Sequence, residues 1–532
     1  MPSKWPAHVQ FKEVILEVAD KKCRACGSAL VIRKDRIHCI YSLEGPLKLV
    51  CKLSCCSNKQ CAERRVLLTP QSEISITMPR WRMGWDVFLW MGFRRFKRHW
   101  SVPQLQAELF DSYQINLSED TITNYLRKYQ IMVAAWHQDV VRLRTDYQDC
   151  LDVILSIDGI QPEKGHETLY VVRELRKQRV WFSESLISSS TAEIGKLIQR
   201  AKNISEQLNK SVVAWVSDKQ GAFVTTIAAE FPNVPHRYCH NHFLHDLAKP
   251  VLEKDSHAKV QMRRKVRGLR NIEKETLAEL DEPFEENDTL NTDQRIYAAK
   301  IVFDYCAAVR GILNDNHGGP LTPPGWRMAN ALENICQSLE RNLSEHSTPI
   351  SSKLRCLYRC IQRGLSIYNQ QKAQIAEYVK GIKVVFDTLN PKKGSMTERF
   401  ADFQQLTVQF AEADDPIKTH MSKIMRSFQP GLFVGSDNLE IPGDNLDLER
   451  WIKKPKGHQR KIHGRQHAGI RIVCEGPTLI PALDAHLSRT EPFLYQDLLP
   501  YVDAQVPESQ MRSLERHRIM KKARSKKKEK NC

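Results

Sequence analysis

The sequence predicts a mixed α/β protein, in which an α/β core is interrupted by an all-helical insertion and preceded by a cysteine-rich module and a pair of helices. Three patterns predict this arrangement. Cysteines crowd between Cys23 and Cys61 among short β-like pieces, apolar runs of strand length lie between residues 150 and 250, and apolar residues recur at helical spacing from about residue 251 to 430. A chain of 532 residues is long enough for several such domains.

The charge balance indicates a polyanionic partner. The chain has 80 Lys and Arg against 62 Asp and Glu, which gives a formal charge of +18. Residues 512–532 hold ten Lys or Arg against two Glu, a net +8, which leaves +10 for the rest of the chain. Because both the body and the tail are basic, we expect a polyanionic partner for the whole chain and not for its tail alone.

We expect a cytoplasmic protein without a membrane partner. No apolar run approaches the roughly 18 residues of a membrane-spanning helix, and the first residues have no apolar signal core. Fifteen cysteines, an odd number, without such a signal favour reduced or metal-bound thiols over a disulfide framework.

Cysteine spacing predicts a zinc site near the N-terminus. A two-residue gap lets both thiolates of a tight turn face one ion, and a second pair further along completes a tetrahedral set. The expected ligands are Cys23, Cys26, Cys56 and Cys61. Cys51 or Cys55 could replace Cys56, and a small β module with neutral thiols is the alternative.

Residues 101–129 predict two helices joined by a turn at Gln114-Ile115-Asn116, with Ser118 as the N-cap of the second helix. On or near the outward face of that helix, polar side chains could reach base edges and phosphates. They are Thr121, Thr123, Asn124, Arg127 and Lys128. We expect a helix-turn-helix that binds DNA; a helical pair with a solvated face is the alternative.

Two aspartates follow apolar, strand-like runs. Asp158 follows Val153–Ile157, and Asp218 comes just after Val212–Val216. If the two strands are parallel neighbours, both carboxylates emerge at one sheet edge, where open α/β sheets place ligands. Carboxylates so close repel each other unless a cation lies between them, so the pair predicts a divalent metal site. A third carboxylate is needed, and the candidates are Glu333, Glu340, Glu440 and Glu449.

These residues are part of a wider resemblance. Asp158, Asp218 in Val-Ser-Asp-Lys-Gln-Gly-Ala-Phe, and the run Arg237-Tyr-Cys239-His-Asn-His242-Phe together resemble the DDE transposases of bacterial insertion sequences, in the broad group that shares Cys-x-x-His with Mutator-like elements. The segment Pro442-Gly-Asp-Asn445-Leu-Asp-Leu-Glu449-Arg-Trp-Ile-Lys, with Arg460-Lys461-Ile-His-Gly464-Arg465 after it, resembles the last motif of that family. The resemblance covers roughly residues 15 to 485.

The resemblance implies an RNase H-like (retroviral integrase-like) catalytic core, with a zinc-ribbon-like module and a helix-turn-helix before it. It implies that Asp158, Asp218 and Glu449 are catalytic and hold Mg²⁺ or Mn²⁺. Residue chemistry also favours Glu449 over Glu440, because a helix capped by Asp444 or Asn445 would place Glu449 in its first or second turn, where the helix dipole favours a carboxylate.

The other motif residues have less definite roles. Cys239 and His242 have the gap of a metal-binding pair, but a buried thiol and a hydrogen-bonded imidazole are an equal alternative. We expect them, with Asn445, beside the site rather than in the chemistry. The basic residues Arg460, Lys461 and Arg465 are expected to contact DNA phosphates.

Together these signals divide the chain into six parts: a cysteine-rich zinc-binding module (1–77), a helix-turn-helix domain (78–135), the first part of an RNase H-like core (150–250), a helical insertion (251–430), the final part of the core with the catalytic Glu (431–485), and an extension with a basic tail (486–532). The insertion is expected because the chain between Asp218 and Glu449 is far too long for a compact sheet.

The function that the resemblance implies is that of a DDE transposase, an enzyme that cleaves DNA at transposon ends and transfers the strands into target DNA. The partners would be double-stranded DNA, as terminal inverted repeats and as target, and a second copy of the chain in a homodimer or larger homo-oligomer. The protein would then be associated with the bacterial nucleoid. A non-catalytic DNA-binding regulator and a structure-selective RNase H-like nuclease are the alternatives.

Overall fold

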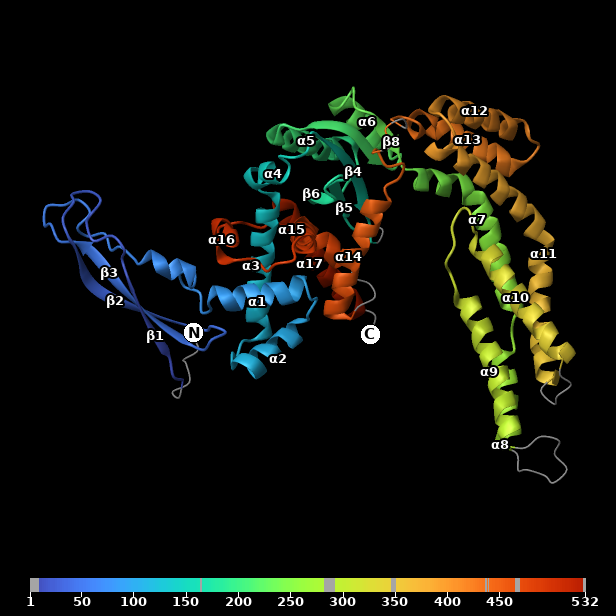
Figure 1. The fold of residues 1–532 in the computed structure, drawn as a ribbon, viewed down its shortest axis with the longest axis horizontal. Helices are drawn as coiled ribbons and strands as arrows, with labels where there is room; N and C mark the ends of the chain where they lie inside the picture. The colour runs from blue at the N-terminus through green and yellow to red at the C-terminus, as the bar shows by residue number, and fades with distance from the viewer. Residues whose placement is uncertain are drawn as a thin grey trace. The chain divides into compact units, whose positions relative to one another are not determined.

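The computed structural model describes residues 9–162, 165–281, 292–345, 351–435, 438, 440–464 and 469–529 (Figure 1). The chain forms two compact units. The first unit combines Met1–Val234 with Leu446–Cys532, and the second is Pro235–Asn445. None of the described helices is both long and apolar enough to cross a membrane.

The first unit begins with a three-stranded sheet made of β1 (Lys12–Glu17), β2 (Leu30–Ile40) and β3 (Leu47–Cys56). The strand order is β1-β3-β2, with β1 parallel and β2 antiparallel to β3. A short 3₁₀-helix, Gln71–Ser75, follows. The sequence predicts short β pieces here at residues 29–32, 36–41 and 47–51, and the structure joins the first two into the single strand β2, which has an irregularity between Ile32 and Lys34. The sequence pattern does not predict β1.

Four helices follow: α1 (Trp85–Phe96), α2 (Val102–Tyr113), α3 (Glu119–Gln138) and α4 (Val140–Asp146). Ser101 caps α2 in a capping box, and Ser118 caps α3 by accepting a hydrogen bond from Thr121 N. Between them Gln114 takes the left-handed conformation, with φ of 54°, which ends α2. The predicted helical pair and its N-cap are confirmed.

The strands of the α/β core in this unit are β4 (Asp152–Ile160), β5 (Thr168–Glu174), β6 (Arg179–Leu186) and β7 (Ser211–Ser217). They lie in the order β6-β5-β4-β7. The first three strands in sequence form an antiparallel meander, and β7 is added parallel to β4. All four strands were expected from their apolar runs, which are typical of strands covered on both faces.

Helices cover both faces of this sheet. The helices α5 (Thr191–Leu208) and α6 (Gly221–Glu230) share a hydrophobic core with one face. The helices α14 (Leu446–His463) and α15 (Gly469–Ser488) share a core with the other face and with α1 and α3. The segment after Asn445 therefore returns to the sheet that the chain left at Val234.

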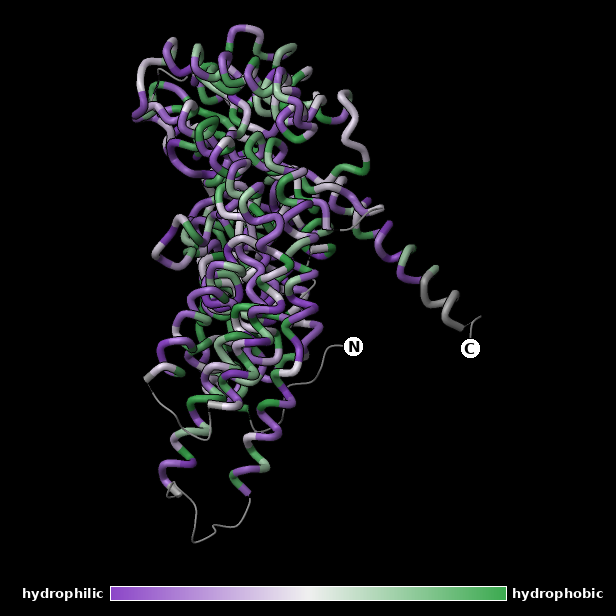
Figure 2. Tube along the Cα trace, turned by 90° about the vertical axis from the view of Figure 1, so that its right-hand side faces the viewer, coloured by the Kyte–Doolittle hydropathy of each residue, from purple (hydrophilic) through white to green (hydrophobic). Residues whose placement is uncertain are grey.

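The first unit ends with α16 (Tyr495–Leu498), the 3₁₀-helix Leu499–Tyr501 and α17 (Glu508–Glu529). Figure 2 shows α17, which leads to the C-terminus, mostly in the hydrophilic colour. Ser509, Gln510 and Ser513 near its start are buried, so the beginning of this helix packs on the unit, whereas residues 521–523 are exposed.

The second unit is helical after the short strand β8 (His236–Tyr238). Its helices are α7 (His240–Lys265), α8 (Leu269–Asp281), α9 (Thr292–Asn314), α10 (Pro324–Glu345), α11 (Ser351–Thr388), α12 (Met396–Glu412) and α13 (Pro416–Leu432), with a 3₁₀-helix at Pro391–Lys393. The helical segment starts before the expected boundary at residue 251, because α7 continues through Pro250 instead of ending there.

Candidate functional site

Asp158 lies at the C-terminal end of β4. Side chains alternate between the two faces of a strand. Leu155 and Ile157 belong to the core under α5 and α6, whereas Ile160 belongs to the core shared with α14. Asp158 therefore faces the α14 side, as Ile160 does. It is half-buried, and its Oδ1 accepts a hydrogen bond from Gly159 N at 2.7 Å.

Asp218 comes directly after β7, at the same end of the sheet. The parallel pairing of β4 and β7 ends at Ile157 and Ser217, which are partners, so Asp158 and Asp218 are the next residues on two aligned strands. Asp218 is also half-buried. The two strands are parallel neighbours, which is the condition under which the sequence argument places both carboxylates at one sheet edge.

Glu449 lies in the first turn of α14. Leu448, on one side of it in sequence, and Ile452, one turn further, are buried in the core that contains Ile160 of β4. The helix contacts β4 directly. Glu449 itself is half-buried, so the third predicted carboxylate is on a helix that packs against the strand bearing Asp158.

An ion pair to β5 and an indole hydrogen bond to Asp484 of α15 hold α14 in place. Arg173 of β5 donates from Nε to Asp447 at 2.6 Å and from Nη1 to Asp484 Oδ1 at 3.3 Å. Trp451 donates its indole N–H to the same Asp484 oxygen at 2.7 Å. Asp447 and Trp451 lie two residues before and two residues after Glu449, so this buried network holds the part of the helix that carries it.

Asp484 is the centre of this network. It is 3% exposed, and its Oδ2 accepts a hydrogen bond from Val180 N at 2.9 Å and lies 3.2 Å from His137 Nε2. Burial raises the pKa of Asp484, but His137 and Arg173 outweigh it and lower that pKa overall. A charged carboxylate therefore persists in the core, because a buried charge needs such partners.

Sequence reasoning missed these supporting residues. A sequence signal existed for both: Arg173 directly follows the apolar run 169–172, and Asp484 lies within the apolar run 479–485. The sequence does not indicate that the two are partners, because they are distant along the chain.

The helix that carries Glu449 is longer than expected. The sequence predicts a short helix near residues 445–454 followed by a basic stretch, but α14 runs from Leu446 to His463 and includes most of that stretch. The basic residues are interleaved with a buried stripe, which continues through Pro455 and ends at Ile462. Pro455 is inside the helix, so it is not the break that its residue type suggests.

The rival carboxylates have other surroundings, all in the second unit. Glu333 forms an ion pair with Lys372 at 2.6 Å, and Glu340 accepts a hydrogen bond from Tyr358. Glu440 is an exposed loop residue. Of the four candidates for the third carboxylate, Glu449 is the one that belongs to the same unit as Asp158 and Asp218.

Cys239, His242 and Asn445 belong to the second unit. Cys239 and Asn445 are fully buried, and the Cys239 thiol accepts a hydrogen bond from Asn445 N at 3.3 Å. Cys239 directly precedes α7, and His242 is half-buried in its first turn. The Cys239 contact fixes the backbone immediately before α14 begins.

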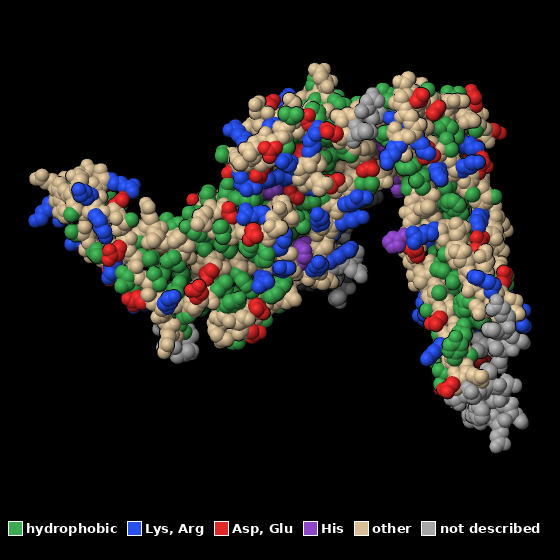
Figure 3. Space-filling model, viewed as in Figure 1, with side chains coloured by type: hydrophobic (Ala, Val, Ile, Leu, Met, Phe, Trp, Pro, Cys, Tyr) green, Lys and Arg blue, Asp and Glu red, His purple; other side chains and the backbone are tan. Residues whose placement is uncertain are grey.

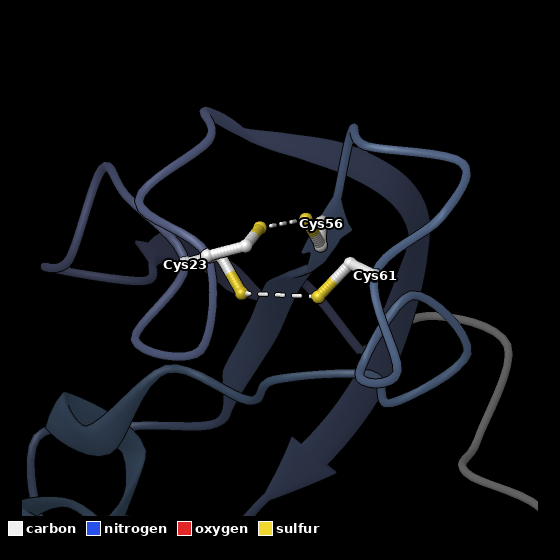
Figure 4. A group of neighbouring side chains, drawn as sticks. Cys23, Cys56 and Cys61 are labelled. Carbon is white, nitrogen blue, oxygen red and sulfur yellow. Dashed lines mark hydrogen bonds between the residues drawn. The ribbon is translucent and has the colours of Figure 1, made fainter.

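The four expected cysteines come together in the N-terminal module and form a candidate metal site. Their sulfur atoms all lie within 4.8 Å of one another. Cys23 Sγ is 3.8 Å from Cys61 Sγ, and Cys26 Sγ is 3.4 Å from Cys56 Sγ (Figure 4). Sulfurs at about 2.3 Å from a tetrahedral zinc ion would be about 3.8 Å apart, so the spacing fits such a site.

The structure also distinguishes among the neighbouring cysteines. Cys51 is buried in the small core of the sheet with Leu49 and Leu53, and Cys55 is outside the group of four. Hydrogen bonds from Ser28 lower the pKa of the Cys26 thiol to about 6, whereas burial raises the pKa of the Cys56 thiol to about 12, so without an ion Cys26 is the member of this pair that favours the thiolate.

The residues predicted to contact DNA are accessible to different degrees. On α3, Asn124 and Arg127 are exposed, whereas Thr121, Thr123 and Lys128 are partly exposed. Arg460 and Lys461 are exposed near the end of α14, and Figure 3 shows Lys and Arg side chains gathered where Figure 1 draws that helix. Arg465 lies outside the described residues.

A scan of the chain against protein-family models finds no match, and a search of curated proteins finds none either.

Proposed function

We propose that this protein is a metal-dependent DNA phosphoryl transferase of the DDE transposase kind, with an RNase H-like core. One observation carries the proposal: Asp158 and Asp218 end two aligned parallel strands, and Glu449 is on a helix that is seated on the same strand as Asp158. Three carboxylates supplied in this way are a fitting donor set for hard divalent cations such as Mg²⁺ or Mn²⁺.

The sheet topology supports the same proposal. Three antiparallel strands, followed by a fourth parallel to the first, give the order β6-β5-β4-β7 in this unit. An RNase H-like core has this arrangement, with one acid on its first strand and another after its fourth. The helical second unit would then be an insertion between β7 and α14.

In this proposal the three carboxylates hold the cations, and the remaining groups position the DNA. Bound divalent ions would activate the attacking oxygen and stabilise the leaving oxygen of the scissile phosphodiester. Arg173, Asp447 and Asp484 keep α14 in place. The exposed Arg460 and Lys461 would bind phosphates near the end of that helix.

The N-terminal elements would recognise DNA. Zn²⁺ held by Cys23, Cys26, Cys56 and Cys61 would stabilise a module whose own hydrophobic core is small. The helix-turn-helix of α2 and α3 and the basic α17 would contact the terminal repeats and target DNA. Because two transposon ends must be joined, the acting form would be a homodimer or a larger homo-oligomer in the cytoplasm.

Cleavage assays with matched acids test the proposal. The chain's preferred duplex is first selected from a randomised DNA library, and the labelled duplex is then incubated with plasmid and Mg²⁺. Asp158→Ala, Asp218→Ala and Glu449→Gln should each lose nicking and joining while they retain binding. Asp152→Asn, at the opposite end of β4, and Glu440→Gln should remain active.

The outcomes separate the proposal from its rivals. Nicking without joining in the native protein would favour a structure-selective nuclease, and sequence-specific binding without nicking would favour a non-catalytic regulator. Full activity of Glu449→Gln would refute the assignment of the third carboxylate.

A further inference from the structure

A basic cavity lies in the first unit, apart from the three carboxylates. Its volume is about 900 Å³, and its walls come from the end of α1, the start of α2, α3, the end of α14, α15 and α17. This is within the size range of small-ligand cavities, about 300–1,000 Å³. A cavity admits a ligand of limited width, whereas a DNA duplex needs an open surface.

The buried guanidinium of Arg95 in the cavity wall could bind an anionic ligand. Arg95 is 6% exposed, and its Nη1 donates to Trp100 O at 2.9 Å. Among the described residues no carboxylate forms an ion pair with it, and the nearby Glu475 is bonded to Arg471 Nε at 2.9 Å instead. Burial lowers the pKa of Arg95 to about 10, so the guanidinium is still charged at neutral pH. Arg127 and Lys461 add positive charge at the same cavity.

The side-chain oxygen of Gln459 in the cavity wall could accept a hydrogen bond from a ligand. Gln459 is 1% exposed, and its Oε1 accepts no hydrogen bond from any described residue. Leaving a buried polar atom unpaired costs about 1–3 kcal/mol. The neighbouring Gln130, by contrast, donates a hydrogen bond from Nε2 to Thr478 Oγ1 at 2.7 Å. Gln459 is therefore the wall residue suited to a ligand N–H.

Two aromatic rings are also among the residues that line the cavity. Phe96 and His458 stack with ring centroids 5.7 Å apart and an interplanar angle of 11°. Burial keeps the pKa of His458 well below its ordinary value, so this ring is neutral at physiological pH. Uncharged aromatic rings, an unpaired amide oxygen and several cations are together suited to a base that carries a phosphate, and less suited to an acidic peptide.

We propose that this cavity binds an unpaired nucleotide of a DNA strand, with Arg95, Arg127 and Lys461 on its phosphates and Gln459 Oε1 accepting a hydrogen bond from its base. The choice of a DNA strand over a free nucleotide rests on the proposed function. The cost of taking a base out of the duplex is least where the strand is already unpaired.

The test is equilibrium binding measured by fluorescence anisotropy in EDTA, where no cleavage occurs. One labelled duplex carries a short single-stranded overhang, and the matched duplex is blunt. The native protein should bind the overhang about tenfold more tightly, as one hydrogen bond to a charged group can provide. Gln459→Leu and Lys461→Ala should each lose most of that preference, whereas Lys177→Ala, in the turn between β5 and β6, should keep it.

The result that overturns the proposal is equal binding of both duplexes by the native protein, or an unchanged preference in both Gln459→Leu and Lys461→Ala. A third outcome would also contradict the proposal: a free deoxynucleoside monophosphate displaces the labelled DNA, and the protein shows no preference for the overhang. The ligand of the cavity would then be a free nucleotide and not part of a DNA strand. Asp158→Ala separates this proposal from the catalytic one, because it should lose cleavage and keep the preference.

Discussion

Truncating Asp484 tests whether the buried network holds α14 on the sheet. In Asp484→Ala the indole of Trp451 and the amide of Val180 lose their acceptor, and Arg173 loses one of its two carboxylates. Each buried donor left unpaired costs about 1–3 kcal/mol, and breaking a buried ion pair costs about 3–5 kcal/mol. These costs overlap, so we expect a total loss of about 4 kcal/mol. Asp484→Asn keeps an acceptor oxygen and should lose about half as much.

The assay is urea unfolding followed by tryptophan fluorescence, together with hydrogen exchange of the α14 amides. Because the folded-state pKa of Asp484 is depressed, its contribution is present above the unfolded pKa of about 3.9 and is lost only as the pH falls below that value. The difference between native and variant should thus persist from neutral pH to about pH 4. A loss below about 1 kcal/mol, or unchanged exchange in α14, would refute the reasoning.

Three further predictions concern other parts of the chain. Burial lowers the pKa of His486 to about 3, so between about pH 7.5 and 5.5 only the unfolded state binds a proton at this residue, and the free energy of unfolding should fall by about 1.4 kcal/mol. In His486→Gln the urea midpoint should therefore depend less on pH, by that amount. An equal pH dependence in the native protein and the variant would contradict the prediction. Gly92→Ala should destabilise the protein by about 1–3 kcal/mol in thermal or urea unfolding, because a Cβ there would lie 2.3 Å from the Tyr129 ring. Gly311→Ala in α9 is the control: its Cβ would meet no atom within 4 Å, so the variant should be more stable by up to about 1 kcal/mol. Equal effects of the two substitutions would contradict the close packing of Gly92 against Tyr129. Purified protein should contain bound zinc by elemental analysis, Cys56→Ser should lose it and Cys39→Ser should keep it; zinc retained in Cys56→Ser would exclude the proposed ligand set.

The parts of the fold that the sequence predicts well are those governed by local pattern. The runs that end at Asp158 and just before Asp218 are apolar at nearly every position, which is typical of buried strands, and they are β4 and β7 in the structure. Ser118 predicts the start of α3 because its hydroxyl can cap a helix whatever the tertiary context.

The parts that the sequence does not predict depend on tertiary packing. Prolines at 250 and 455 suggest breaks, yet α7 and α14 continue through them. The pair of Arg173 and Asp484 spans 311 residues, so no local pattern indicates it. The sequence leaves Cys51 and Cys56 as alternatives for one zinc ligand. Only the structure decides between them, because it places Cys51 in the core of its sheet.

The central claim is that Asp158, Asp218 and Glu449 together hold divalent cations. Its most direct test is the anomalous scattering of Mn²⁺ in crystals of the native protein, compared with crystals of Glu449→Gln. The account predicts Mn²⁺ within coordinating distance of all three carboxylates and a weakened signal in the variant. Mn²⁺ bound elsewhere, or bound at Asp158 and Asp218 with Glu449 turned away and the variant unchanged, would contradict it.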